Sequence, residues 1–100
     1  AYTIAMLLLE DGRFRDWYTR VFGSDISRRV LTTARGAVYG AMSFRTTPDA
    51  MLLRYFTEVD GRHRLRDEVR ALCSFGQLNL LAGDRYRLLG PCDVIFCRNV

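Results

Sequence analysis

The strongest constraint on the fold of this chain comes from its last eight residues, 93–100. An acidic residue opens this run, three apolar residues follow, and a polar step of cysteine, arginine and asparagine comes next. Because Gly90-Pro91 supplies a turn before it, the run predicts a buried strand of a parallel sheet. The polar step falls at the carboxyl end of that strand, where open α/β sheets bind ligands. A central strand at the end of the chain predicts a piece of a larger domain.

The first half of the chain predicts two helices around one strand. Residues 1–10 are apolar nearly all round and predict a buried helix that ends at Asp11-Gly12. A short strand is expected over residues 19–25. Helical spacing follows over residues 26–34, and Gly36 is expected beyond that helix in the left-handed conformation.

The second half predicts a small insert and then a return to strands. Thr47 is expected to cap a helix that runs to about Tyr55. Asp60-Gly61 lies between two short β-prone runs, which indicates a hairpin. A helical turn over residues 66–72 and a strand within residues 73–81 complete the order, which is that of an α/β fold.

Charge and cysteine content narrow the class of protein. The chain of 100 residues has a net charge of +4, and every basic residue other than the single histidine is arginine. Codon bias and an arginine-rich surface for phosphate or carboxylate both explain that choice. The arginines are scattered among acids, so we expect no nucleic-acid partner. Three cysteines fit no zinc pattern, so we expect no metal and a reducing cytoplasm. No apolar run is long enough to insert into a membrane.

Asp25 is the first candidate ligand-binding residue. It lies with Ser24 at the end of a predicted strand and opens a helix. A carboxylate there offers paired acceptor oxygens for the two hydroxyls of a ribose. An ordinary N-cap for the following helix is the alternative interpretation.

Two further polar positions follow later strands. The Asn79 amide offers a donor and an acceptor to an adenine edge, and Leu80 offers an apolar surface to the ring; an ordinary turn is the alternative. Arg98 and Asn99 suit a small polar ligand or a carboxylate. A buried arginine paired with an acid elsewhere is the alternative there. Polar residues at the ends of three successive strands are the arrangement that a nucleotide-like cofactor needs.

Six segments in this order resemble one known family: residues 1–6, 23–27, 38–40, 54–56, 75–81 and 93–100. The chain resembles the middle of the CheR family, the bacterial chemotaxis receptor methyltransferases, over nearly all of its length. The resemblance implies a Rossmann-like domain that binds S-adenosylmethionine, with three α/β/α layers in the parent enzyme. It also implies methyl transfer to glutamate side chains of chemoreceptors, whose cytoplasmic domain would be the partner of a monomeric, cytoplasmic parent.

The same resemblance assigns roles to the candidate residues. Asp25 would hold the ribose, while Asn79 and Leu80 would contact the adenosyl part. Arg98 and Asn99 would line the cofactor pocket near its reactive end. The acceptor carboxylate is ionised at neutral pH, so positioning and electrostatics are expected to replace base catalysis. His63, the only histidine, is therefore expected at the surface of the hairpin.

Departures from the family pattern define the expected domain organisation. The family's Gly-rich loop and a cofactor-binding glutamate are expected before Ala1, an N-terminal helical domain before them, and further strands after Val100. Residues 1–100 are thus expected to be an inactive fragment of one catalytic domain. Residues 38–66 correspond to a β-subdomain-like insert. Its hairpin is short compared with members that grip a receptor's C-terminal pentapeptide, which predicts a parent without that tether.

Two other functions fit the same fold. A signalling module without catalysis would keep the fold and bind cofactor or receptor. A small-molecule methyltransferase would share the sheet, although residues 93–100 resemble the receptor methyltransferases. Retention of Asp25, Asn79 and Arg98 favours the enzyme, because a module freed from cofactor binding needs none of them.

Overall fold

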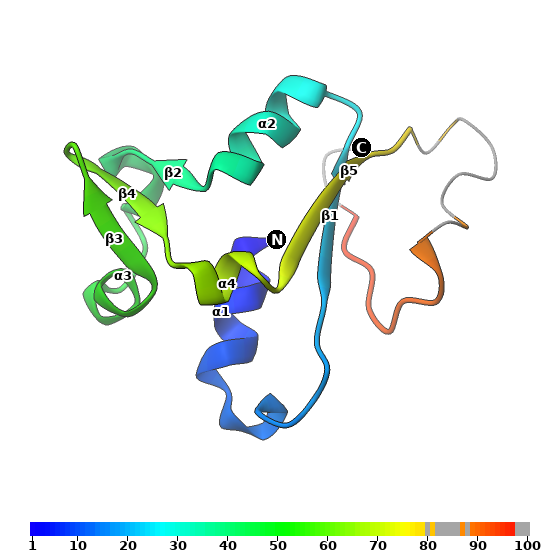
Figure 1. Ribbon diagram of the computed structural model, residues 1–100, viewed down its shortest axis with the longest axis horizontal. Helices are drawn as coiled ribbons and strands as arrows, with labels where there is room; N and C mark the ends of the chain where they lie inside the picture. The colour runs from blue at the N-terminus through cyan, green and yellow to red at the C-terminus, as the bar shows by residue number, and fades with distance from the viewer. Residues whose placement is uncertain (80, 82–86, 88, 98–100) are drawn as a thin grey trace.

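We describe a computed structural model of the chain that covers residues 1–79, 81, 87 and 89–97, with Ala41 and Met42 described by backbone alone. The α/β prediction is confirmed, because helices and strands alternate and form one parallel and one antiparallel sheet (Figure 1). The elements are α1 (Tyr2–Glu10), η1 (Gly12–Phe14), β1 (Val21–Asp25), α2 (Arg28–Gly36), β2 (Val38–Tyr39), η2 (Ala41–Phe44), α3 (Asp49–Tyr55), β3 (Phe56–Val59), β4 (Arg62–Leu65), α4 (Asp67–Arg70) and β5 (Cys73–Gln77).

The parallel sheet consists of β1 and β5, which pair in register from Val21 opposite Cys73 to Asp25 opposite Gln77. Two glycines make room for phenylalanine rings in this ladder. A Cβ on Gly23 would lie 2.7 Å from the ring of Phe75. Because β1 and β5 run in the same direction, both end at the same edge of the sheet.

The antiparallel sheet has the order β2-β4-β3 and forms the small insert. Asp60 and Gly61 both have positive φ angles, 49° and 74°, as a two-residue type I′ turn requires. The hairpin prediction is therefore confirmed. Phe44 packs edge-on against Phe56 and against His63, with ring centroids 4.9 Å and 5.1 Å apart. His63 is consequently half-buried, so only part of its side chain lies at the surface of the hairpin, where it was expected.

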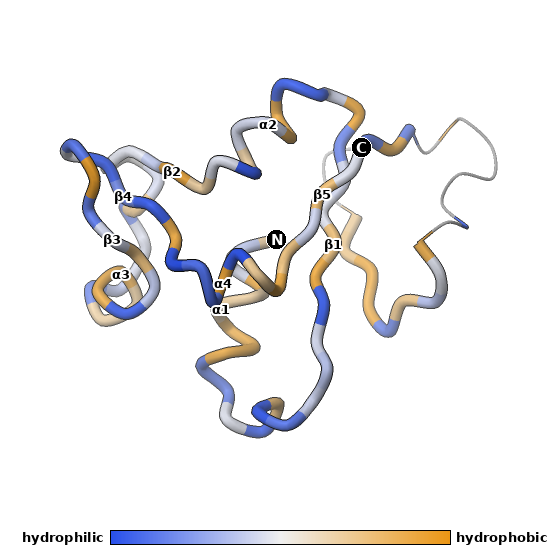
Figure 2. Tube along the Cα trace, in the orientation of Figure 1, coloured by the Kyte–Doolittle hydropathy of each residue, from blue (hydrophilic) through white to orange (hydrophobic). Residues whose placement is uncertain are grey.

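Helix α1 links the two sheets. Its apolar residues lie beside α4 and between the sheets in the view of Figure 2. At its start, Tyr2 is buried and donates a hydrogen bond of 2.7 Å to the Ala34 carbonyl oxygen. At its end, the Glu10 carboxylate accepts from the Tyr55 hydroxyl at 2.8 Å and pairs with Arg54. The insert is thereby fixed to the same helix that packs against β5.

The predicted strand over residues 93–97 is wrong. These residues form no strand, and Val94, Ile95 and Phe96 are 70%, 78% and 74% exposed. Their apolar composition predicts burial, but a parallel strand also needs a paired neighbour and covering helices. No strand among the described residues pairs with this segment, and its apolar side chains are exposed.

Three smaller predictions also need correction. Gly36 is the last residue of α2, and the left-handed residue is Ala37, with φ of 55°. Thr47 makes no cap; Pro48 precedes α3 and its carbonyl oxygen accepts from Leu52. Helix α1 is buried on one side only, since Leu7 is 58% exposed. In each of the three predictions the element was correct, but packing determined which neighbouring residue begins or ends it or which face of it is buried.

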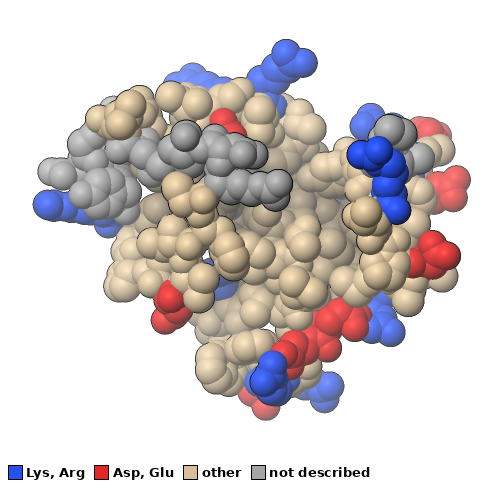
Figure 3. Space-filling view, turned by 180° about the vertical axis from the view of Figure 1, so that it is seen from behind, with Lys and Arg blue, Asp and Glu red and all other residues tan. Residues whose placement is uncertain are grey.

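The face seen from behind is largely uncharged at its centre, with basic and acidic side chains around its rim (Figure 3). The described residues form no continuous basic strip on this face. None of the described helices is long and apolar enough to cross a membrane.

Candidate functional site at the carboxyl ends of β1 and β5

Asp25 ends β1 and organises the start of α2. Its Oδ1 accepts a hydrogen bond of 2.8 Å from the Ser27 amide. Ser27, the N-cap residue of α2, accepts from the Val30 amide at 3.3 Å. The N-cap of α2 is therefore Ser27 and not Asp25. Asp25 forms the turn before the cap, and its Oδ2 has no partner among the described residues, which leaves an acceptor oxygen for a ligand.

Asn79 lies at the same edge of the sheet. The Leu78 amide donates to the Asp25 carbonyl oxygen at 3.1 Å, which extends the pairing of β1 and β5 beyond their last residues. Asn79 is exposed, and its Oδ1 accepts from the Leu81 amide at 3.0 Å. Because the amide oxygen is held in this turn, the two N–H donors of the side chain are the groups left for a ligand. The structure thus brings Asp25 and Asn79 to one edge, as predicted.

A side-chain network that the sequence did not reveal locks this edge. Gln77 Nε2 donates to the Ile26 carbonyl oxygen at 2.8 Å. Gln77 Oε1 accepts from Arg28 Nε at 3.0 Å. These bonds fix the segment after β1 to the end of β5. The Ile26 side chain remains 60% exposed and offers an apolar surface between Asp25 and α2.

Three of the predicted site residues lie outside the described residues. They are Leu80, Arg98 and Asn99. Their roles therefore stay predictions from the resemblance.

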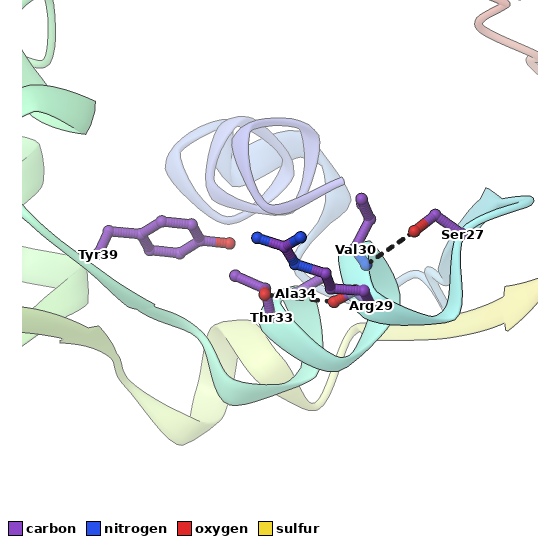
Figure 4. A pocket seen from close by; sticks show the side chains of 6 residues that line it. All are labelled: Ser27, Arg29, Val30, Thr33, Ala34 and Tyr39. Carbon is purple, nitrogen blue, oxygen red and sulfur yellow. Dashed lines mark hydrogen bonds between the residues drawn. The ribbon is translucent and has the colours of Figure 1, made fainter.

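A hollow of about 490 Å³ adjoins the site on the α2 side. Figure 4 shows the Tyr39 ring extending from β2 across this hollow, with its hydroxyl toward the Arg29 guanidinium of α2. Val30 and Ala34 supply its apolar lining, and Ser27 and Thr33 complete it. No pattern in the sequence predicts this site, because Arg29 and Tyr39 meet through the orientation of α2 against β2.

Burial raises the pKa values of the groups beside this hollow. Burial, and secondarily the neighbouring Cys73, raises the pKa of the Tyr39 hydroxyl. The Cys73 thiol has its own pKa raised by burial. Both groups are therefore uncharged near neutral pH, and Tyr39 presents a proton that it can donate in a hydrogen bond.

A second hollow, of about 320 Å³, lies at the far end of α1, near η1. Trp17 and Phe14 line it with Arg15 and Leu72. Leu72 and Thr19 precede their strands, so this hollow adjoins the amino ends of β1 and β5. That is the edge opposite Asp25.

Comparison with known proteins shows that the chain is similar to one family over its whole length. Residues 1–100 match a family model described as CheR methyltransferase, SAM binding domain. The chain is 39% identical to the chemotaxis protein methyltransferase of Escherichia coli K12 over 99% of this chain and 36% of that protein. It is 37% identical to the Salmonella typhimurium protein of the same name, over 99% of this chain and 35% of that protein. It is 36% identical to chemotaxis protein methyltransferase 2 of Pseudomonas aeruginosa, over 99% of this chain and 36% of that protein. The chain thus spans about a third of the length of the curated relatives that it matches.

Proposed function

The chain belongs to the CheR methyltransferase family, and on that premise we propose that it is the cofactor-binding part of an enzyme that methylates glutamate side chains of chemoreceptors. The family's cofactor-binding domain has a Rossmann-like fold, with which the parallel pair of β1 and β5 agrees. The relatives are named for chemotaxis and methyl transfer, which supports the class of reaction. One structural observation carries the proposal: Asp25 and Asn79 lie at the same carboxyl edge of a parallel sheet.

The described residues fit S-adenosylmethionine at this edge. Asp25 has an acceptor oxygen without a partner in the described part of the chain, and this oxygen suits ribose hydroxyls. The Asn79 amide donors have no acceptor among the described residues and suit a ring nitrogen, and Ile26 has an exposed apolar side chain. We propose that these groups, with Leu80, hold the adenosyl part, and that Arg98 and Asn99 line the pocket near the reactive end.

The chemistry requires little from this chain beyond positioning. The bound cofactor supplies an electron-poor methyl group on a sulfonium. A glutamate side chain is ionised at neutral pH and needs no base to become a nucleophile. Asp25 and Asn79 orient the cofactor, and the Gln77 network keeps the edge rigid. A small loss of alignment is costly in a reaction governed by approach geometry.

We further propose that residues 38–66 form the acceptor-facing insert of the enzyme. Their antiparallel sheet is fixed to α1 through Glu10, Arg54 and Tyr55. The insert therefore has a set orientation relative to the edge that carries Asp25. A rigid insert can present a protein acceptor to the cofactor without a hinge movement.

Asp25→Asn in the full-length protein tests the proposal. The change removes the charge that strengthens hydrogen bonds to the ribose, and we expect the Kd for S-adenosylhomocysteine to rise by about 10-fold or more. Isothermal titration calorimetry measures that Kd, and transfer of labelled methyl groups to a chemoreceptor cytoplasmic domain measures activity. Asp16→Asn, at an exposed acid before β1, is the matched control. Unchanged affinity in Asp25→Asn contradicts the assigned site, and absence of transfer by the unaltered protein contradicts the function.

A further inference from the structure

We propose that the hollow between α2 and β2 binds an acidic side chain of the protein that accepts the methyl group. The inference rests on the proposed function, because it takes a protein acceptor from it. It adds a contact that the assigned cofactor residues do not provide. That contact is a carboxylate site built by Arg29 and Tyr39.

Two hydrogen-bond donors face each other across the hollow without partners. The Arg29 guanidinium and the Tyr39 hydroxyl each lack a hydrogen bond or ion pair within the described part of the chain. They come from different elements and point toward the same space (Figure 4). A carboxylate accepts from both at once, and its bond with a guanidinium is among the strong ones in proteins.

Packing holds the Tyr39 ring in place, while Arg29 is exposed and only its backbone is fixed. The Tyr39 ring makes edge-on contacts with Tyr2 and Phe44, at centroid distances of 6.4 Å each. Arg29 lies in the first turn of α2, which Ser27 caps. A fixed tyrosine ring loses little conformational entropy when a ligand binds.

The lining also suits the stem of an acidic side chain. Val30 and Ala34 provide apolar surface between the two donors. None of the residues that line the hollow is acidic. A glutamate or aspartate can therefore place its methylene groups on the apolar lining while its carboxylate meets Arg29.

Charge on α2 favours an acidic occupant. The helix contains three arginines and no acid. Arg28 and Arg35 are bonded to β5, through the Gln77 side chain and the Phe75 carbonyl oxygen. Arg29 remains as the arginine of α2 available to a partner. Ser27 lines the hollow and donates its amide proton to Asp25, so an acid bound here lies beside the predicted cofactor edge.

A binding experiment tests the hollow independently of activity. The probe is N-acetyl-glutamate N′-methylamide, which has one carboxylate, added to the full-length protein in complex with S-adenosylhomocysteine. We expect saturable NMR shifts of the Arg29 Nε–H signal and of the Val30 and Ala34 backbone amide signals, and in Arg29→Gln we expect the two amide signals to shift no longer. N-acetyl-glutamine N′-methylamide, of the same shape without the charge, is expected to cause none. Equal shifts with both probes, or none with either, overturn the inference.

A kinetic experiment tests the same contact with a protein acceptor. In methyl transfer to a chemoreceptor cytoplasmic domain, we expect Arg29→Gln to raise KM about five- to tenfold while kcat changes less than about twofold. Tyr39→Phe, which keeps the ring, is expected to raise KM about two- to threefold. Arg15→Gln removes the same charge at the opposite end of the sheet and is the control.

Acceptor variants identify the occupant. Acidic residues near the methylated glutamate are changed one at a time to their amides. On the acceptor that lacks the contacting acid, Arg29→Gln is expected to cause no further rise in KM, as a double-mutant cycle requires. A KM for Arg29→Gln that equals the unaltered enzyme's on every acceptor overturns the inference. If the unaltered enzyme transfers no methyl group, the proposed function fails instead, and the probe titration still decides the hollow.

Discussion

The contact of Gly23 with Phe75 gives a sharp test of how tightly the parallel sheet is built. Gly23→Ala adds a Cβ that would lie 2.7 Å from two carbons of the Phe75 ring. Carbon atoms rest comfortably at about 3.5–4.0 Å, so the ring or the strand must move by nearly 1 Å. The Phe75 ring also packs edge-on against buried Tyr2, with centroids 5.4 Å apart. The ring therefore cannot retreat without disturbing the core.

From this geometry we expect Gly23→Ala to lower the free energy of unfolding by about 1–3 kcal/mol, the usual cost of overpacking. Thermal unfolding of the full-length protein, followed by circular dichroism, measures the effect. In a domain of about 150–250 residues, each kcal/mol lowers Tm by about 2–4 °C. A drop of several degrees is thus expected.

Gly36→Ala is the matched control with the opposite sign. Gly36 ends α2, and a Cβ there meets nothing within 4 Å. Alanine in its place reduces the entropy of the unfolded chain and is expected to raise stability by about 0.4–1 kcal/mol. Gly23→Ala combined with Phe75→Leu should recover part of the loss, because the clashing ring is gone. A Tm for Gly23→Ala at or above that of the unaltered protein refutes the packing argument.

Three further outcomes follow from particular residues. Asp60→Val should destabilise the hairpin by about 1 kcal/mol or more in the same melt, since a β-branched residue does not tolerate the positive φ of this position, whereas Asp60→Asn should be neutral. The side-chain and backbone hydrogen bonds from Arg13 lower the pKa of the Asp11 carboxyl to about 2. This acid therefore stabilises the fold fully above its ordinary pKa near 3.8 and loses that contribution as the pH falls toward 2. NMR titration should give a midpoint near 2 for Asp11, and Arg13→Gln should move it upward; an unmoved midpoint contradicts the pairing. The short β3–β4 hairpin predicts that the full-length enzyme binds a receptor C-terminal pentapeptide more weakly than micromolar, and a micromolar Kd by calorimetry contradicts this.

Local signals in the sequence predicted the elements that local physics determines. Asp60-Gly61 specifies a two-residue turn through its positive φ angles, and the hairpin formed where predicted. Residues 93–97 show the limit of such signals. Their apolar side chains predict burial, but pairing depends on residues far away in the chain, and no strand formed there. The composition of a segment thus predicts that it can form a buried strand, while its neighbours in the fold determine whether the strand forms.

The candidate site likewise contains residues that the sequence could predict and residues that it could not. Asp25 and Asn79 were predictable because each follows a strand, and parallel strands bring their carboxyl ends together. Arg29 and Tyr39 belong to different elements, and no spacing rule connects them. Their meeting depends on how α2 is rotated and on where the insert is attached. The contacts of Tyr2 with Tyr39 and with the Ala34 carbonyl oxygen help to fix that relation.

The exclusive use of arginine also gains a physical explanation that composition alone did not provide. Several arginines join separate elements by donating to backbone carbonyl oxygens: Arg20 to Ala71, Arg35 to Phe75, Arg66 to Leu53 and Arg70 to Arg35. A guanidinium suits this task because it carries five donors in a fixed plane on a long side chain. These four guanidinium groups therefore have a structural role as cross-links within the fold. Arg29 makes no such cross-link to a described residue, and it lies beside the predicted cofactor edge with its guanidinium facing a hydroxyl across a hollow. The guanidinium of Arg29 is therefore better evidence for an acidic residue in the acceptor protein than the net charge of the chain is.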